Sequence, residues 1–236
     1  MLEKWLEGDV LAAMMDAREG TRAAMSEPEL IDESWTLVNA GNDTTATSLA
    51  WAIYYIVSNP EVLAELRSDL GQGGEWSADR IAQQPYLDAT VKEVTRIAPI
   101  FLFVLRRLAE PMRVGKRELP TGTLVAPCIY LSHRRPDIWE EPERFNPRRF
   151  LDGRYPAHQY FPFGGRIRHC IGAAMATYEM KLVLARILTL ADLKIAPSYV
   201  AKPKWLGNFI GPSKDLSVVC ERHRASTKMG VSRISA

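Results

Sequence analysis

The chain has 236 residues, of which 47% are hydrophobic and 25% are charged, a balance typical of a folded globular protein and not of a disordered one. Its net charge of only +2 gives no argument for binding to nucleic acid or to an anionic membrane. The three cysteines are far apart and never spaced as CxxC, which argues against a disulfide framework and against a zinc site. No apolar run is long enough to span a membrane. We therefore expect a cytoplasmic protein without a membrane segment and without a nucleic-acid partner.

The N-terminal part of the chain is predicted to be helical. Apolar residues recur at helical spacing over residues 2–15, and Gly20 ends that pattern. Ser26 is followed three positions later by Glu29, the pattern of a capping box, and this predicts the start of a second helix. That helix can continue until Pro60 ends it.

The middle of this long helix carries the segment AGNDTT, residues 40–45. A glycine and four polar side chains interrupt an otherwise apolar helix there. Asp43 and Thr44 have low helix propensity and compete with the helix for backbone hydrogen bonds. Their clustering therefore indicates a role other than helix formation.

The rest of the chain predicts short helices, then short strands, then one more long helix. Helices are expected at 60–70, 85–97 and 171–191, short extended runs at 101–108, 112–119 and 123–131, and a β-hairpin within 200–219. On the last helix Met175, Tyr178, Leu182, Ala185 and Leu188 form one apolar stripe. The residues after 222 are expected to be a disordered tail.

The most informative stretch is FPFGGRIRHCIG, residues 161–172. Cys170 is predicted to open a helix, where unpaired N–H groups and the helix dipole favour a thiolate, and Arg168 adds positive charge nearby. A thiolate in such a place suits a soft or borderline metal. The alternative is a buried structural cysteine, which is the common fate of a lone free cysteine.

Two further patterns carry charge. Glu93 and Arg96 stand three positions apart on a predicted helix and so share one face, although such a pair alone is also an ordinary surface ion pair. The segment PERFNPRRF, residues 142–150, supplies Arg144 in a proline-rich loop.

In this order and at these separations, the four patterns resemble the cytochrome P-450 superfamily of haem-thiolate monooxygenases. The cysteine loop of that family, F-x-x-G-x-R-x-C-x-G, is matched by Phe163, Arg168, Cys170 and Gly172. The surrounding sequence is most similar to soluble bacterial members. The resemblance implies the C-terminal, haem-binding half of the family's fold, which is mainly α with small β-sheets (α+β).

The resemblance also implies a haem b cofactor. Cys170 would be the axial thiolate on the haem iron. Arg168 and Arg106 would bind the haem propionates, because a planar guanidinium suits a carboxylate. Phe163 would pack beneath the ring, and Gly172 would let the backbone come close as the helix begins.

The remaining matches imply roles in oxygen activation and in structure. Asp43 and Thr44 would relay protons to dioxygen, and Gly41 would leave room for it beside the helix. A buried charge cluster would fix the loop beneath the haem, and its members would be Glu93, Arg96 and Arg144.

One position of the cysteine loop departs from the family pattern. The family has glycine at the fourth position, where this chain has Arg166. If the backbone there has a positive φ, arginine costs about 1–2 kcal/mol.

The resemblance covers about residues 10–222, which is about the C-terminal half of a full family member. We therefore expect residues 1–222 to form a partial cytochrome P-450 domain, with 223–236 as the tail. The family's N-terminal sheet, a propionate-binding helix and the lid over the substrate have no counterpart in these residues.

The implied function is insertion of one oxygen atom from O2 into a small hydrophobic substrate, with electrons from a ferredoxin or flavodoxin-type donor. The substrate pocket would be lined by 35–40, 100–104 and 208–210. The donor would dock on arginines near the cysteine, namely Arg148, Arg149, Arg154, Arg166 and Arg168. Two alternatives are a non-catalytic remnant of such an enzyme and a haem-binding or haem-sensing module without turnover.

Overall fold

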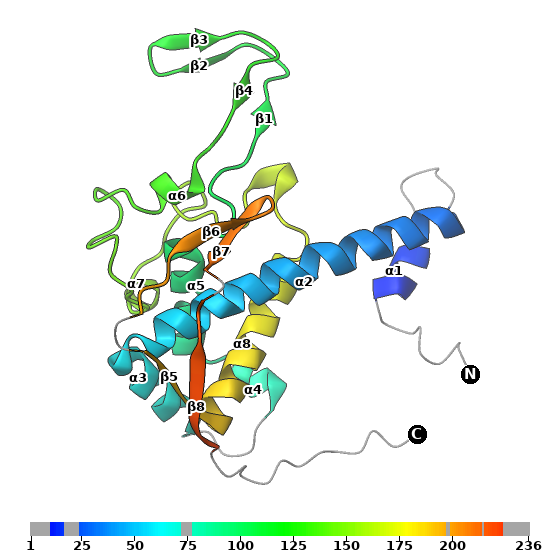
Figure 1. The fold of residues 1–236 in the computed structure, drawn as a ribbon. Helices are drawn as coiled ribbons and strands as arrows, with labels where there is room; N and C mark the ends of the chain where they lie inside the picture. The colour runs from blue at the N-terminus through cyan, green and yellow to red at the C-terminus, as the bar shows by residue number, and fades with distance from the viewer. Residues whose placement is uncertain (1–9, 17–23, 72–76, 197–198, 214, 224–236) are drawn as a thin grey trace. The chain divides into compact units, whose positions relative to one another are not determined.

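The computed structural model describes residues 10–16, 24–71, 77–196, 199–213 and 215–223 (Figure 1). The chain divides into two compact units, an N-terminal unit (Met1–Thr44) and a main unit (Thr45–Ala236). The long second helix runs through the boundary between them. The two units are described separately.

Helices are the main regular structure of the described residues. They are α1 (Val10–Asp16), α2 (Glu27–Val57), α3 (Pro60–Gly71), α4 (Ala78–Ala82), α5 (Pro85–Ile97), α6 (Ile129–Ser132), α7 (Arg149–Asp152) and α8 (Ala173–Leu190), with a 3₁₀ turn at Arg166–Arg168. The bounds of α2 and α5 confirm the two helices that capping and proline signals predict. None of the described helices is both long and apolar enough to cross a membrane.

The start of α2 shows the predicted cap. The Glu29 carboxylate accepts hydrogen bonds from the Ser26 backbone N–H at 2.8 Å and from the Ser26 hydroxyl at 2.7 Å. This pairing satisfies a backbone donor that the first turn of the helix leaves free. None of the described residues from 10 to 44 is buried, so the described part of the N-terminal unit has no core of its own.

The core lies in the main unit. It is formed where the C-terminal part of α2 packs with α3, α5 and α8, and Ile56, Leu66 and Leu184 are fully buried within it. Fully burying one such side chain stabilises the fold by about 1.5–3 kcal/mol. These helices therefore form the rigid frame on which the loops of the main unit are held.

Within the described residues, four small antiparallel sheets of two strands each accompany the helices. The strands are β1 (Arg106–Arg107), β2 (Met112–Val114), β3 (Arg117–Leu119), β4 (Leu124–Val125), β5 (Ala191–Ile195), β6 (Pro203–Leu206), β7 (Phe209–Pro212) and β8 (Val218–His223), paired as β1 with β4, β2 with β3, β5 with β8 and β6 with β7. The β2–β3 and β6–β7 hairpins turn at Gly115 and Gly207, whose φ angles of 59° and 72° suit glycine. The chain is thus mainly helical with small sheets, as the sequence predicts.

Three details differ from the sequence expectations. Residues 129–132 form the helix α6 and not a strand, and the short helix α4 was not expected. The predicted hairpin within 200–219 is limited to β6 and β7, because β8 pairs with β5. The expected tail (223–236) lies outside the described residues, apart from the end of β8, and so does the beginning of the first predicted helix.

Candidate functional site

The helix α5 carries a buried ion pair. Arg96 Nε donates to Glu93 Oε2 at 2.7 Å, and Arg96 Nη2 donates to Glu93 Oε1 at 2.8 Å. Both side chains have an exposed fraction of 0%. A bidentate arginine–carboxylate pair is a strong, directional interaction, and this one holds two charges in the core.

Arg96 also binds the loops that follow α5. Its Nη1 donates to the backbone carbonyls of His133 and Pro142, both at 2.8 Å, and its Nη2 donates to the Arg144 carbonyl at 3.3 Å. The remaining donors of a buried guanidinium are thereby satisfied, which a buried charge requires. The ion pair therefore anchors residues 133–144 to α5.

The third member of this cluster is Arg149, not Arg144. Arg149 Nε donates to Glu93 Oε1 at 3.2 Å, and the side chain of Arg149 is 6% exposed. The side chain of Arg144 is 62% exposed and pairs with Glu141 at 2.8 Å, so only its carbonyl belongs to the cluster. This corrects the sequence expectation, and the buried charge cluster hereafter means Glu93, Arg96 and Arg149.

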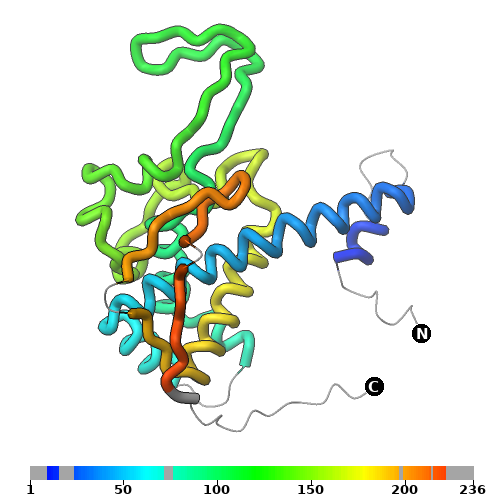
Figure 2. Tube along the Cα trace, in the orientation of Figure 1, coloured from blue at the N-terminus to red at the C-terminus, as the bar shows by residue number. Residues whose placement is uncertain are grey.

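The cysteine loop, residues 161–172, leads directly into α8 (Figure 2). The Cys170 backbone N–H donates to the Phe163 carbonyl at 3.0 Å, and the Cys170 carbonyl accepts from the Ala173 N–H at 3.3 Å. Because α8 begins at Ala173, Cys170 precedes the helix and does not open it. Its thiol is free and exposed.

The departure at Arg166 has a structural cost. Arg166 has a φ of 54°, in the left-handed region that a residue with a Cβ atom adopts only under strain. The positive φ that the family's glycine at this position suggests is therefore present at Arg166. Gly164, with a φ of 71°, supplies a second left-handed position that glycine takes at no cost.

The donor groups of the cysteine loop fit a haem. Cys170 offers a free thiol as a metal ligand, and Arg168 offers an exposed guanidinium that, within the described residues, is in no ion pair. A thiolate suits iron, and a guanidinium suits a propionate carboxylate. Phe163 is half-buried at the start of the same loop, and its ring lies 6.4 Å from that of the exposed His169.

Two other residues expected around a haem are Arg106, which lies outside this loop, and Gly172, which ends it. Arg106 lies on β1, and its Nη1 donates to the Leu105 carbonyl at 2.8 Å. Among the described residues, no hydrogen bond or ion pair joins Arg106 to Cys170. Gly172 has a φ of −83°, which does not require glycine, and a Cβ atom there would meet Cys170 Sγ at 4.0 Å.

Residues 40–44 of the polar segment of α2 lie in the N-terminal unit, and Thr45 is the first residue of the main unit. The Thr44 hydroxyl donates to the Ala40 carbonyl at 2.6 Å, and Asn42 Nδ2 donates to Asp43 Oδ1 at 2.9 Å. Asp43 is exposed, and a Cβ atom added to Gly41 would meet nothing within 4 Å. The helix therefore accommodates this segment by satisfying its polar groups locally.

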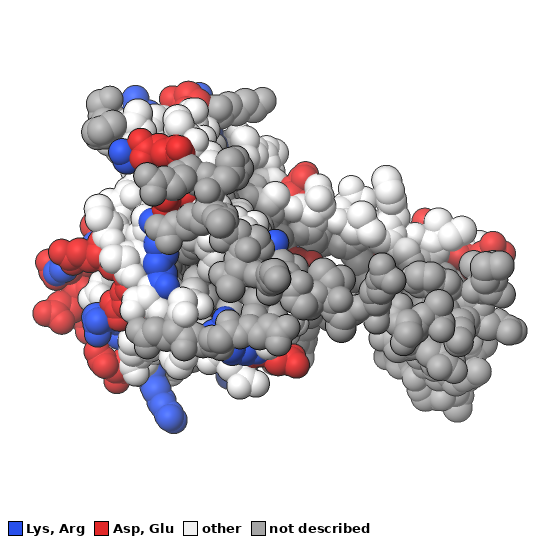
Figure 3. Space-filling model, turned by 90° about the horizontal axis from the view of Figure 1, so that it is seen from below, with Lys and Arg blue, Asp and Glu red and all other residues white. Residues whose placement is uncertain are grey.

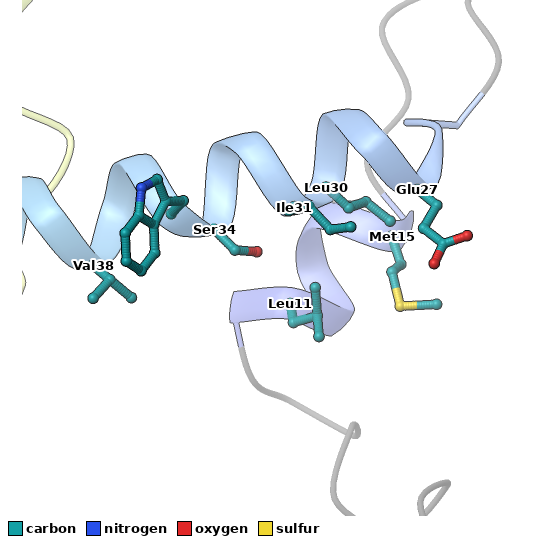
Figure 4. Close-up of a pocket in the computed structure, with 8 residues that line it drawn as sticks. Leu11, Met15, Glu27, Leu30, Ile31, Ser34 and Val38 are labelled. Carbon is teal, nitrogen blue, oxygen red and sulfur yellow. The ribbon is translucent and has the colours of Figure 1, made fainter.

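Two of the three segments expected to line a substrate pocket contact each other. The Ile210 N–H donates to the Ile100 carbonyl at 2.7 Å, and the rings of Phe101 and Phe209 are 6.3 Å apart. The third segment, 35–40, belongs to the N-terminal unit. There it forms part of an apolar groove of about 460 Å³ between α1 and α2, and the lining residues drawn in Figure 4 include Leu11, Leu30, Ile31, Trp35 and Val38.

The arginines near the cysteine fall into different environments. Arg149 is buried, and Arg148 is exposed and paired with Glu65 at 2.7 Å. Arg154, Arg166 and Arg168 are exposed. On the face drawn in Figure 3, the visible basic and acidic side chains are intermixed.

Comparison with known proteins identifies the family of this chain. The model of the family described as cytochrome P450 matches residues 6–216. The chain belongs to the cytochrome P450 family. Cytochrome P450 135B1 of Mycobacterium tuberculosis is 37% identical over 198 residues, which are 83% of this chain and 41% of that protein. Taurochenodeoxycholic 6 alpha-hydroxylase of Sus scrofa is 34% identical over 201 residues, which are 83% of this chain and 40% of that protein.

Solved structures of the family share the fold. The retinoic acid-bound cyanobacterial CYP120A1 superposes with a TM-score of 0.82 at 28% identity, covering 92% of this chain and 53% of that one. A cytochrome P450 described as CYP102L1 gives 0.81 at 25% identity, covering 92% and 50%. The chain thus spans about two fifths of the length of the curated P450 relatives it matches. Membership of this family implies a cysteine-ligated haem.

Proposed function

We propose that these residues form the haem-binding portion of a P450 monooxygenase, which inserts one oxygen atom from O2 into an organic substrate. The observation that carries the proposal is the cysteine loop. It presents a free, exposed thiol at Cys170, whose backbone N–H donates to the Phe163 carbonyl, three residues before α8 begins. The family membership of the chain supports it.

The residues of the cysteine loop would hold the cofactor. Cys170 would supply the axial thiolate, Arg168 and Arg106 would bind the propionates, Phe163 would shield the sulfur from water, and Gly172 would allow close approach of the backbone. The haem, when bound, supplies the redox-active iron that dioxygen activation needs. The buried charge cluster would act at a distance, by keeping the loops around the cysteine in place.

Asp43 and Thr44 would move protons during oxygen activation. The Thr44 hydroxyl now donates to the Ala40 carbonyl, and the Asp43 carboxylate accepts from Asn42. A hydroxyl can rotate to donate elsewhere, and an exposed carboxylate can exchange protons with water. Gly41 would leave space for dioxygen beside the helix, since nothing lies within 4 Å of its absent Cβ atom.

The substrate we propose is small and hydrophobic. The segments 100–104 and 208–210 bring apolar and aromatic residues together in the main unit. One relative is named for its action on taurochenodeoxycholic acid, and one solved relative is described as bound to retinoic acid. Both of those molecules carry a large apolar skeleton, which supports the class of substrate and nothing narrower.

The electron donor we propose is an acidic ferredoxin or flavodoxin-type protein in the cytoplasm. Four of the five arginines expected to attract it are exposed, namely Arg148, Arg154, Arg166 and Arg168, and Arg148 is paired with Glu65. Arg149 is removed from the expected docking set, because its side chain is buried in the charge cluster.

One observation favours a second candidate function. The strained Arg166 stands in the loop that would carry the haem, and its φ of 54° is the kind of position where the family has glycine. A non-catalytic remnant would tolerate such strain because nothing would depend on the loop. A haem-sensing module that binds haem without turnover is the other alternative.

The ferrous–CO spectrum of the chain loaded with haemin tests the assignment of Cys170. We expect a strongly red-shifted Soret band, which reports an intact thiolate bond, and we expect Cys170→Ser to abolish it. Cys128→Ser and Cys220→Ser are matched controls and should retain the band. A band that survives in Cys170→Ser would refute the ligand assignment, and a wild-type chain without the band would favour the remnant.

A further inference from the structure

His133 occupies a place between the buried charge cluster and the cysteine loop. It directly follows α6, and its side chain has an exposed fraction of 0%. Its backbone carbonyl accepts a hydrogen bond from Arg96 Nη1 at 2.8 Å. Its imidazole Nε2 accepts a hydrogen bond from the Phe161 backbone N–H at 3.0 Å. One residue therefore binds the charge cluster with its main chain and the first residue of the cysteine loop with its side chain.

From Phe161 a short series of backbone hydrogen bonds leads to the cysteine. The Phe161 carbonyl accepts from the Gly164 N–H at 3.0 Å, and the Phe163 carbonyl accepts from the Cys170 N–H at 3.0 Å. The residues 166–171 are exposed, so packing does little to fix this part of the loop. Its position depends on where residues 161–163 are held.

The imidazole of His133 cannot easily leave its place. It stacks on the Tyr160 ring, with centroids 5.4 Å apart and planes at 26°, and it meets the Trp139 and Phe161 rings edge-on at 6.0 Å and 5.4 Å. Such contacts between aromatic rings fix orientation as well as buried area. The backbone N–H of Phe161, which is partly buried, thus finds its acceptor on a side chain that is held in place by its neighbours.

The chemistry of the ring agrees with an acceptor role. A nitrogen that accepts a hydrogen bond carries no proton, so the proton of neutral His133 is on Nδ1, which has no hydrogen-bond partner among the described residues. Burial, together with the nearby positive charges of Arg96 and Arg134, lowers the pKa of His133 to about 3. His133 therefore remains neutral, and Nε2 remains an acceptor, near neutral pH.

We propose that His133 is a positioning residue for Cys170, which uses its imidazole acceptor to fix the start of the cysteine loop to the buried charge cluster. The proposal rests on the proposed function only where it concerns haem, since the positioning of the loop is a property of the chain itself. The competing explanation is that His133 merely fills space among aromatic rings.

Two substitutions distinguish the role of His133 Nε2 as a hydrogen-bond acceptor from the space that the ring fills. His133→Phe keeps a planar ring of similar size but leaves the Phe161 N–H without an acceptor. His133→Gln loses the ring but can place an amide oxygen near the position of Nε2. A matched control is Tyr160→Phe, which removes the hydroxyl that contacts Thr95 at 2.7 Å in the same aromatic cluster and leaves the Phe161 bond untouched.

Amide hydrogen exchange across residues 161–170 of the 236-residue chain is the first measurement. We expect His133→Phe to speed exchange of these amides by roughly tenfold relative to the buried part of α8, the effect of losing one hydrogen bond. His133→Gln should restore most of the protection, and Tyr160→Phe should leave this segment unchanged. Equal exchange in His133→Phe and the wild type, or faster exchange in His133→Gln than in His133→Phe, would overturn the proposal.

The wild-type chain offers a second measurement if the phenylalanine variant does not fold. The ¹⁵N chemical shifts of the His133 ring should show the proton on Nδ1 and an unprotonated Nε2. A proton on Nε2 would overturn the proposal without any variant.

After loading with haemin, the fraction of the ferrous–CO adduct in the red-shifted band should fall in His133→Phe and recover in His133→Gln. A wild-type chain that shows no such band would refute the proposed haem ligation. In that case the exchange result would still decide the role of His133.

Discussion

Arg144 and Arg149 lie close together in the sequence but in opposite environments. The side chain of Arg144 is 62% exposed and faces Glu141, whereas that of Arg149 is 6% exposed and binds Glu93. The segment 142–150 contains the pattern Pro-x-Arg-Phe twice, at 142–145 and at 147–150. The letters of the first copy match as well as those of the second, and only the folded loop shows which guanidinium reaches α5.

The two arginines should therefore differ in their effect on stability. Arg149→Ala removes a charged hydrogen bond to Glu93 and two bonds to backbone carbonyls, so we expect it to lower the free energy of unfolding by about 2–3 kcal/mol. Arg144→Ala removes only an exposed ion pair and should change it by less than about 0.5 kcal/mol. Urea unfolding of both variants in dilute solution measures the difference. A larger loss in Arg144→Ala would place the third member of the cluster at Arg144 after all.

At the scale of elements, the cysteine loop combines features that the sequence predicts with one that it does not. The positive φ at Arg166 follows from the family pattern, because glycine at a fixed position implies a special backbone. The start of α8 at Ala173 was not predicted, since a helical pattern alone cannot tell its first residue from the preceding turn.

Replacement of Arg166 by glycine should relieve the strain in this loop. Glycine removes a cost of about 1–2 kcal/mol at a φ of 54°, and it adds about 0.5–1 kcal/mol of flexibility to the unfolded chain. We expect Arg166→Gly to be more stable by up to about 1 kcal/mol in thermal unfolding. Arg168→Gly is the control, because Arg168 lies in the same 3₁₀ turn but not at a positive φ, and glycine there should destabilise. A stability loss in both variants would show that Arg166 is not strained in solution.

Long elements were easier to predict than short ones for a physical reason. The helices α2 and α5 have capping or proline signals at their ends and many apolar positions, so local sequence determines them. The short helices α4 and α6 make too few local interactions to be recognised, and tertiary packing decides them. The pairing of β5 with β8 joins segments distant in sequence, which no local pattern can predict.

The apolar periodicity of α8 predicts a longer buried face than the structure has. The predicted stripe is buried at Ala185 and Leu188, but Met175 is 60% exposed and Tyr178 is 39% exposed. The pattern marks a face of the helix that is apolar along its whole length. Only the part that meets the other helices of the main unit is covered in these residues.

At the scale of the whole molecule, burial is distributed unequally between the two units. The core cluster of the described residues lies within the main unit, while none of the described residues 10–44 is buried. Composition alone does not predict this difference, because apolar residues are frequent in the N-terminal unit as well. The apolar face of that part of α2 borders the groove shared with α1, yet Ile31, Trp35 and Val38 on it remain exposed.

This apolar face should make the chain associate with itself. Ile31, Trp35 and Val38 follow one another at helical spacing on α2 and are 61%, 70% and 63% exposed. Burying apolar area yields about 25 cal/mol per Å², so a few hundred Å² covered at each contact yields several kcal/mol. We expect residues 1–236 to sediment as a broad range of oligomers whose size grows with protein concentration.

Charged residues at these three positions should remove that driving force. The variant with Ile31→Lys, Trp35→Glu and Val38→Lys should sediment mainly as a monomer, because association would then bury unpaired charges. The matched control alters three other exposed positions of the same helix, Asp32→Asn, Thr36→Glu and Asn39→Lys, which changes the net charge by the same amount without removing apolar area. It should remain associated. If the control dissociates as the first variant does, net charge and not the apolar face governs the association; if the wild type is monomeric at every concentration, the face is covered within the chain itself.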